Sequence, residues 1–226
     1  PLLGVFFGPT APTNFDEAEA LAENGAYHRE FITQSDWFHT GEGMRGIMEQ
    51  GLSDPTDSKL RSRMTRFAGL YMNEDPAAPN YDPEHKILLS ARLGSGGPHY
   101  TPEEARETAS HHSSETYGLP FYDLPGINSY VDTQDPGNAR RMGQAVHDRW
   151  QKGEVVGNLS ATSLVTNAFL LTGDEKYREW VLEYTDAWMD RARKNDWLMP
   201  DNVGHSGKVG EYLDGKWYGG LYGWTY

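Results

Sequence analysis

The sequence lacks several features on which large classes of protein depend. It contains no cysteine, which excludes disulfide frameworks, thiolate zinc sites and cysteine nucleophiles. Basic residues are few: 20 Lys and Arg stand against 33 Asp and Glu, and the formal net charge of −13 argues against a general nucleic-acid binder or a binder of anionic membranes. No run of the sequence approaches the roughly 18 apolar residues of a membrane-spanning helix.

Motifs for nucleotide binding and for α/β-hydrolase chemistry are missing too. The sequence has no P-loop, no Gly-x-Gly-x-x-Gly after a strand-like run and no Gly-x-Ser-x-Gly. What it has in quantity is aromatic residues, with 13 Tyr, 8 Phe and 7 Trp among 226 residues. Rings must therefore supply much of the apolar area of the core. A chain of this length can bury a sizeable core, and we expect one domain over residues 1–226, or a large part of a bigger domain.

Two segments of the chain can be aligned with each other. Residues 57–72 match residues 174–189 at an Asp, a Lys, an Arg and a closing Met. Both carry apolar residues at i, i+4, i+7 and i+11, which is one stripe of an amphipathic helix. These positions are Leu60, Met64, Phe67 and Tyr71 in one segment, and Tyr177, Val181, Tyr184 and Trp188 in the other. The match predicts a repeated helix–turn–helix unit, although generic amphipathicity could also produce it.

The second repeat predicts how its helices are placed. The helix expected over 159–171 is apolar or small nearly all round, which is typical of a helix covered on most sides. The helix expected over 174–195 carries charged residues away from its stripe. One inner and one outer helix form the pair that builds α/α solenoids and toroids. We therefore expect an all-α fold, an α/α-hairpin toroid with long irregular loops on one rim.

The remaining helices are predicted from residues that start and stop helices, and the loops from proline and glycine. Helices are expected from about Asn14, over 37–50, over 102–113 and over 136–151. Residues 73–101 and 114–135 are broken by proline and glycine, and only Ile87–Arg92 resembles a strand. Loops of this length in compact domains are usually functional or disordered.

The stretch 200–226 is the most distinctive part of the chain. It combines seven glycines and six aromatic residues with four groups suited to chemistry: Asp201, His205, Glu211 and Asp214. Glycine permits close approach of the backbone, aromatic rings offer flat apolar faces, and carboxyl or imidazole groups transfer protons. A sugar ring needs that combination. The alternative is a glycine-rich loop whose rings cap the core.

Together, the expected pairs of helices and the ending Asp214-Gly-Lys-Trp-Tyr-Gly-Gly-Leu-Tyr-Gly-Trp224 resemble the six-hairpin glycosidase-like enzymes. This family includes unsaturated glucuronyl hydrolases and the toroid domains of several polysaccharide lyases. The resemblance is architectural over roughly residues 15–226 and at the level of motif only near the C-terminus. It implies a sugar substrate in a central funnel, with carboxylates, or Tyr and His in the lyases, as catalysts. A full six-hairpin ring needs more chain than this, so an incomplete ring or a truncated chain is expected.

A first candidate site lies near residue 36. Asp36, His39 and Gly43 share one helical face at i, i+3 and i+7, and Trp37 would stand beside them as a stacking wall. At the start of an inner helix these groups would open into the funnel. Asp36 could instead be a helix cap, and His39 a structural histidine.

The C-terminal stretch offers the second set of candidates. Glycoside hydrolysis uses a protonated acid and a carboxylate base or nucleophile roughly 5 to 9.5 Å apart. Burial among rings would raise a carboxyl pKa, as the acid role requires. Asp36 and Asp214 are the candidate catalytic carboxylates, and Glu211 can replace either. The substrate-binding candidates are His39, Trp37, His205, Trp217, Tyr218, Tyr222 and Trp224. Asp214, which precedes Gly215, could equally be a turn residue.

Two further groups are weaker candidates. Residues 73–84 gather oxygen ligands suited to a hard cation, but without EF-hand spacing, so ordinary Asx turns are the preferred interpretation. His99 and Tyr100, after a glycine-rich run, could supply the base and acid of a lyase. We expect no metal and no cofactor.

The sequence therefore predicts a carbohydrate-active enzyme, with a glycoside hydrolase as the preferred reaction. The alternatives are a polysaccharide lyase acting on a uronate-containing glycan and a sugar-binding protein without catalysis. The expected partner is an oligosaccharide or polysaccharide, with no nucleic acid and no membrane. A periplasmic or secreted location suits a polysaccharide-acting enzyme. The oligomeric state is left open.

Overall fold

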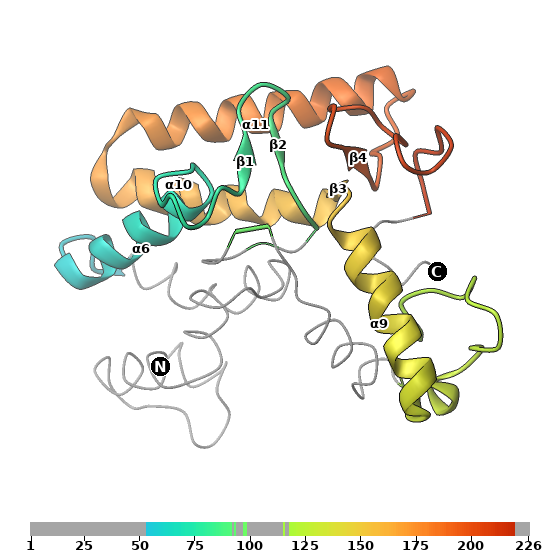
Figure 1. Ribbon diagram of the computed structural model, residues 1–226. Coiled ribbons are helices and arrows are strands. Elements are labelled where there is room, and N and C mark those ends of the chain that lie inside the picture. Colours follow the sequence, from blue (N-terminus) through green and yellow to red (C-terminus); the bar gives the residue numbers. More distant parts are fainter. Residues whose placement is uncertain (1–52, 92, 94–96, 99–114, 116–117, 220–226) are drawn as a thin grey trace. The chain divides into compact units, whose positions relative to one another are not determined.

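The computed structural model describes residues 53–91, 93, 97–98, 115 and 118–219 (Figure 1). This part of the chain is mostly helical, as predicted. Its helices are α6 (Ser58–Leu70), η2 (Tyr130–Gln134), α9 (Pro136–Trp150), η3 (Val156–Ser160), α10 (Ala161–Thr172) and α11 (Glu175–Lys194), of which η2 and η3 are 3-10 helices. Its strands are β1 (Tyr81–Asp82), β2 (Ile87–Leu88), β3 (Gly153–Glu154) and β4 (Val203–Gly204).

The chain divides into two compact units. Unit 1 comprises residues 1–80, 94–97 and 158–186, and unit 2 comprises residues 81–93, 98–157 and 187–226. Each is described by itself below. The expectation of a single domain stays a prediction.

Unit 1 contains α6 packed against α10. Helix α6 begins after Asp57, whose side chain accepts hydrogen bonds from the N–H groups of Lys59 and Leu60 at 2.8 and 3.1 Å. The predicted stripe of α6 is confirmed, because Leu60, Met64, Phe67 and the following Tyr71 are all buried. The stripe therefore forms the core side of this helix.

Helices α10 and α11 form the predicted consecutive pair. Six of the twelve residues of α10 are buried, but Leu170 is 55% exposed, so the helix is less completely covered than its apolar sequence predicts. It ends at Gly173, whose φ of 70° is the left-handed conformation that closes many helices. After Asp174 the chain enters α11 and turns back (Figure 1). In α11 the stripe residues Tyr177 and Tyr184 are buried. Val181 was predicted to belong to the stripe but is only half-buried, whereas Trp180 is buried and stacks on Tyr184 at 4.9 Å.

Unit 2 has its core around α9. Helix α9 begins at Pro136, next to the capping side chain of Asp135, and its position confirms the helix predicted over 136–151. Its buried residues pack with those of neighbouring loops in one cluster, whose members are Ala91, Leu119, Phe121, Ile127, Met142, Val146, Trp150 and Val155. Two of these eight residues, Phe121 and Trp150, are aromatic.

Unit 2 contains two short antiparallel strand pairs, a local hairpin and a pair that joins distant parts of the chain. In the first, Tyr81 pairs with Leu88, which makes residues 83–86 a tight turn. In the second, Gly153 pairs with Gly204, so that the C-terminal stretch is attached to the end of α9. Strands β2 and β3 are neighbours as well. Apart from the strand-like run at Ile87–Arg92, these pairings were not expected from the sequence.

One 3-10 helix differs from the prediction, and three predicted helices lie outside the described residues. The 3-10 helix η2 lies in residues 114–135, which were predicted to be irregular; it is bonded locally, since Asp132 accepts from the N–H of Ser129 at 2.9 Å. The helices expected from Asn14, over 37–50 and over 102–113 lie outside the described residues. No helix in the described part of the chain is long and apolar enough to cross a membrane.

Candidate functional site

The site begins with the segment 201–219, called the tail loop here, which is folded onto itself by hydrogen bonds. Asn202 is buried, and its side chain accepts from the N–H of Gly210 at 3.1 Å and donates to the carbonyl of Lys216 at 3.2 Å. Asp201 accepts from the N–H of Gly219 at 2.8 Å. These bonds give the tail loop a defined shape, in which the two residues of β4 are the regular secondary structure.

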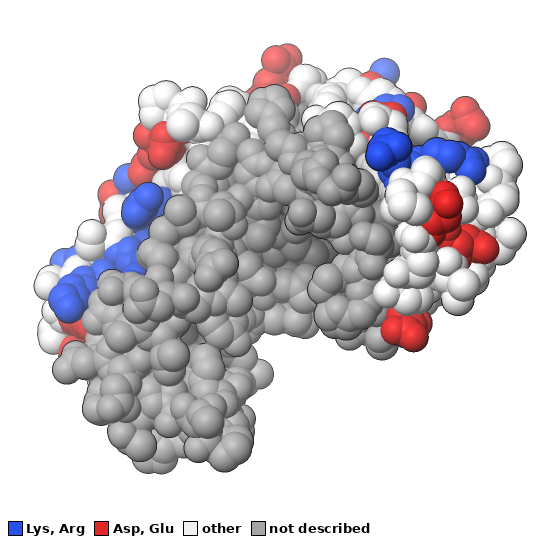
Figure 2. All heavy atoms as spheres, turned by 60° about the horizontal axis from the view of Figure 1, so that its bottom comes forward, with Lys and Arg blue, Asp and Glu red and all other residues white. Residues whose placement is uncertain are grey.

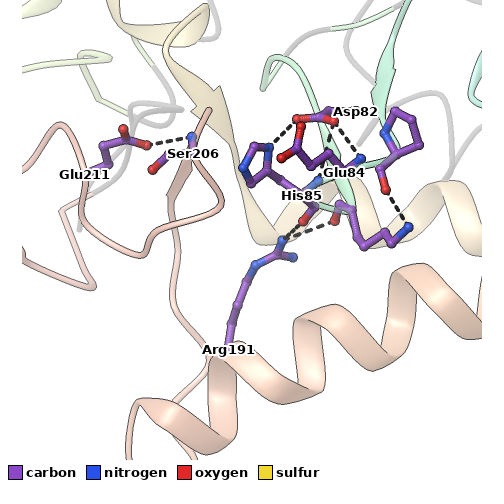
Figure 3. A network of polar contacts seen from close by, with 8 residues as sticks. Asp82, Glu84, His85, Arg191, Ser206 and Glu211 are labelled. Carbon is purple, nitrogen blue, oxygen red and sulfur yellow. Dashed lines mark hydrogen bonds and ion pairs between the residues drawn. The ribbon is translucent and has the colours of Figure 1, made fainter.

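Glu211 is held against the first part of the tail loop. Its Oε2 accepts a hydrogen bond from the backbone N–H of Ser206 at 2.9 Å (Figure 3). Its side chain also occupies the space over Gly204, where an added Cβ would lie 2.4 Å from the Cβ of Glu211. The side chain of Glu211 is nevertheless exposed. The burial expected for a catalytic acid is thus not present at Glu211.

Asp214 lies at a tight turn of the tail loop. Its φ is 54°, in the left-handed region, and the N–H of Gly215 bonds to the carbonyl of Gly210 at 2.9 Å across the turn. The side chain is exposed. The structure therefore agrees with the alternative that Asp214 is a turn residue, and a catalytic role for it stays a prediction.

Aromatic rings line the tail loop. Tyr218 is 56% exposed and meets Trp217 edge to face at 5.1 Å, and Tyr212 is 43% exposed and meets the His205 ring at 6.0 Å. Exposed rings of this kind can stack on the apolar face of a sugar. The other predicted site residues, Asp36, Trp37, His39, Tyr222 and Trp224, lie outside the described residues.

His205 is attached to a distant part of unit 2. Its Nε2 lies 2.9 Å from the carbonyl oxygen of Leu89. A carbonyl can only accept, so Nε2 carries the proton and donates it. In the neutral ring Nδ1 then keeps its lone pair. His205 fixes the tail loop to the end of β2, and its exposed ring can still accept a hydrogen bond from a ligand.

A second histidine, which the sequence analysis did not select, lies beside the tail loop. His85, in the turn between β1 and β2, places its Nδ1 2.6 Å from Oδ2 of Asp82. Partial burial raises the pKa of the Asp82 carboxyl, but hydrogen bonds from the His85 ring and from the N–H groups of Glu84 and His85 lower this pKa by more, so that the net pKa lies below its usual value. Asp82 is therefore ionised at neutral pH.

The His85 backbone is fixed by a buried arginine. Arg191, on α11, is 8% exposed and donates through Nη2 to the carbonyls of His85 at 2.6 Å and Lys86 at 3.2 Å (Figure 3). The His85 ring points toward the tail loop, and a Cβ added at Gly207 would lie 3.2 Å from the Cβ of His85. The spacing Asp-x-x-His at a turn was the only signal for this pair in the sequence. Its proximity to the tail loop depends on contacts that the sequence does not display.

The oxygen-rich segment 73–84 forms Asx turns, as the preferred interpretation predicted. Asp75 accepts from the N–H of Ala77 at 2.9 Å, and Asp82 accepts from the N–H of Glu84 at 2.8 Å. Within the residues that the structure describes, no group of three or more His, Cys, Asp or Glu side chains could hold a metal ion. Asp75 and Asp82 thus accept hydrogen bonds within turns, and Asp82 also contacts His85.

Comparisons with known proteins assign the chain to a family but not to an activity. A family model described as "Domain of unknown function (DUF8034)" matches residues 13–226. The search of curated proteins and the search of solved structures gave no match. The function must therefore be inferred from the residues themselves.

Proposed function

We propose that this chain, which belongs to the DUF8034 family, is a carbohydrate-active enzyme that hydrolyses a glycosidic bond by carboxylate acid/base catalysis. One observation carries the proposal: the tail loop presents exposed rings, carboxylates and an imidazole on one short, self-bonded segment. The rings are those of Tyr212 and Tyr218, and the polar groups are Glu211, Asp214 and His205. Stacking faces beside hydrogen-bonding and acid/base groups suit a pyranose ring.

An α/α-hairpin toroid is part of the proposal. It is supported by the consecutive pair α10–α11, by the buried stripes of α6 and α11, and by the resemblance of the ending to the six-hairpin glycosidase-like enzymes. In such a ring the loops at one rim hold the substrate. The tail loop would be one of them.

The roles follow from the residues available. Asp214 and Asp36 are the two catalytic carboxylates, Asp214 as the general acid, and Glu211 can replace either. His205 would accept a hydrogen bond from a sugar hydroxyl through Nδ1, since its Nε2 donates to the Leu89 carbonyl, and His39 would also hydrogen-bond substrate. The stacking residues would be Trp37, Trp217, Tyr218, Tyr222 and Trp224. Because Glu211 and Asp214 are exposed, a bound glycan would have to supply the burial that keeps an acid protonated.

The same exposure favours a second candidate, a sugar-binding protein without catalysis. Glu211 satisfies the N–H of Ser206 and Asp214 occupies a left-handed turn, so both carboxylates have a use in shaping the tail loop. Rings on a well-formed loop without an effective acid/base pair would bind glycans and leave them intact.

The test is an assay of the purified chain on a panel of neutral and uronate-containing oligosaccharides. Hydrolysis releases reducing ends without new ultraviolet absorbance, whereas a lyase produces an unsaturated uronate that absorbs. We expect Asp214→Asn to lower kcat about 10²- to 10⁴-fold, the usual share of acid/base catalysis, with unchanged affinity. Asn tolerates the left-handed conformation of residue 214, so the turn is kept. Glu179→Gln, on the exposed face of α11, is the matched control.

The outcomes separate the candidates. Unchanged turnover in Asp214→Asn removes Asp214 from the mechanism. An ultraviolet-absorbing product identifies a lyase. Binding by the wild-type chain without any product supports the sugar-binding protein.

A further inference from the structure

We propose that His85, oriented by Asp82, is the proton acceptor of the site at the tail loop, where it activates the water that attacks a glycosidic carbon. The inference rests on the proposed function and deepens it. It assigns the role of general base to His85, which lies within the described residues, in place of the candidate carboxylate Asp36, which does not. The substrate class is a glycan whose scissile bond lies between His85 and a carboxyl group of the tail loop.

The first step concerns the tautomer of His85. Asp82 is ionised at neutral pH, and an ionised carboxylate can only accept a hydrogen bond. The proton of this bond, at 2.6 Å, therefore belongs to Nδ1 of His85. In the neutral ring Nε2 then carries the lone pair. A carboxylate that holds one ring nitrogen in this way fixes the tautomer and stabilises the imidazolium that forms when Nε2 takes a proton.

The second step concerns the position of the ring. The side chain of His85 is 34% exposed, so solvent and ligands can reach it. Arg191 fixes the backbone on one side through two carbonyls, and Gly207 borders the side chain on the other. The loop that contains Gly207 also holds Ser206, whose N–H binds Glu211 (Figure 3). One histidine and one tail-loop carboxylate thus flank the same short segment.

A comparison within the chain shows what is particular about this pair. His147 and Asp148 on α9 also form an imidazole–carboxylate contact, at 3.1 Å. They are sequence neighbours, and the Asp148 side chain is 53% exposed, against 23% for Asp82. Gly207 of the tail loop borders His85, whereas the hydrogen bonds of the His147 and Asp148 side chains are with each other and with Gln144. The pair at His147 is therefore a matched control for the pair at His85.

The reaction balances with these groups. The oxygen of water forms a bond to the anomeric carbon as one of its protons passes to Nε2 of His85. The bond from that carbon to the glycosidic oxygen breaks, and this oxygen takes a proton from a tail-loop carboxylic acid, Asp214 or Glu211. Hydrolysis with inversion uses a base and an acid on opposite sides of the bond in this manner. The imidazolium and the carboxylate then exchange their proton through solvent.

The test uses His85→Asn in the whole chain. The Asn amide nitrogen takes the place of Nδ1 and can still donate to Asp82, so the turn keeps its hydrogen bond while the base at Nε2 is lost. We expect kcat on a cleaved oligosaccharide to fall about 10²- to 10⁴-fold with KM and melting temperature unchanged. His147→Asn should leave kcat unchanged. In the ¹⁵N NMR spectrum of the neutral ring, wild-type His85 should show a protonated Nδ1 and an unprotonated Nε2.

Several results would overturn the inference, and they are distinguishable from failure of the proposed function. If the wild-type chain cleaves glycans and His85→Asn does so at the same rate, His85 only stabilises the turn. If Asp36→Asn abolishes turnover while His85→Asn retains it, the base is Asp36. A protonated Nε2 on neutral His85 would contradict the tautomer directly. If the wild-type chain cleaves no glycan of the panel, the proposed function fails and this inference fails with it.

Discussion

Single residues in the described part of the chain show how closely the backbone constrains the sequence. Gly153, in β3, has a φ of 149°, and a Cβ added there would lie 2.1 Å from the carbonyl oxygen of Val203 in β4. Gly173, after α10, has a φ of 70° but no atom within 4 Å of an added Cβ. The first glycine is required by conformation and by space, and the second by conformation alone.

These two glycines make a quantitative prediction. Gly153→Ala should lower the free energy of unfolding by about 3 kcal/mol, because overpacking against backbone adds to the strain of a positive φ. Gly173→Ala should lower it by about 1 kcal/mol, the cost of the left-handed conformation for a residue with a Cβ. Urea unfolding of both variants measures the difference. Equal losses would mean that the β3–β4 pair relaxes to admit a methyl group.

Helices α6 and α10 differ in how the N–H groups of their first turn are capped. Helix α6 has a side-chain cap, since Asp57 accepts from the N–H groups of Lys59 and Leu60. Helix α10 follows η3, and its N-cap residue, Ser160, makes no capping hydrogen bond through its side chain. The preceding 3-10 turn takes the place of a capping side chain at α10.

The two cap positions predict different losses of stability for the same substitution to alanine. Asp57→Ala should destabilise the protein by about 1 kcal/mol, the typical cost of losing an N-cap side chain. Ser160→Ala should change the free energy of unfolding by less than about 0.5 kcal/mol, because no cap is lost. Chemical denaturation followed by circular dichroism gives both values. A loss at Ser160 as large as that at Asp57 would contradict the assignment of the caps.

For the whole molecule the dominant property is its charge. The formal net charge is −13, and among the described side chains seen in Figure 2 the basic ones gather at the left and at the upper right, with acidic side chains near both groups. A polyanionic glycan is therefore repelled at long range, whereas a neutral glycan is not. This is the physical reason for preferring hydrolysis of a neutral substrate over lysis of a uronate polymer.

If the chain cleaves glycans as proposed, its net charge predicts that kcat/KM for a charged glycan depends on the salt concentration. Between about 10 and 150 mM salt the Debye length falls from about 30 to 8 Å, which screens the repulsion. We expect kcat/KM for a uronate polymer to rise several-fold over this range, and kcat/KM for a neutral polymer to stay constant. Initial rates on the two substrates provide the measurement. A fall in kcat/KM for the uronate polymer would instead indicate a local basic site that recognises it.

The sequence determined the features of this protein that depend on neighbours along the chain. Apolar periodicity located α6 and α11, since the stripe of a helix repeats every three or four residues, and helix signals located α9. The Asx turns of segment 73–84 and the loop character of residues 201–219 were also predicted, because turn residues act on their immediate neighbours along the chain. Trp180 took the place expected for Val181, because periodicity gives the face of a helix but not which large side chain at its border fits the core.

Only the tertiary structure decided which polar groups meet. Arg191 reaches the carbonyl of His85 across 106 positions of sequence, and His205 reaches the carbonyl of Leu89 across 116. No pattern in the sequence predicts such bonds, because each joins a side chain to a backbone carbonyl, and every residue has a backbone carbonyl. They bring the Asp82–His85 pair to the tail loop, and the proposed proton acceptor depends on them.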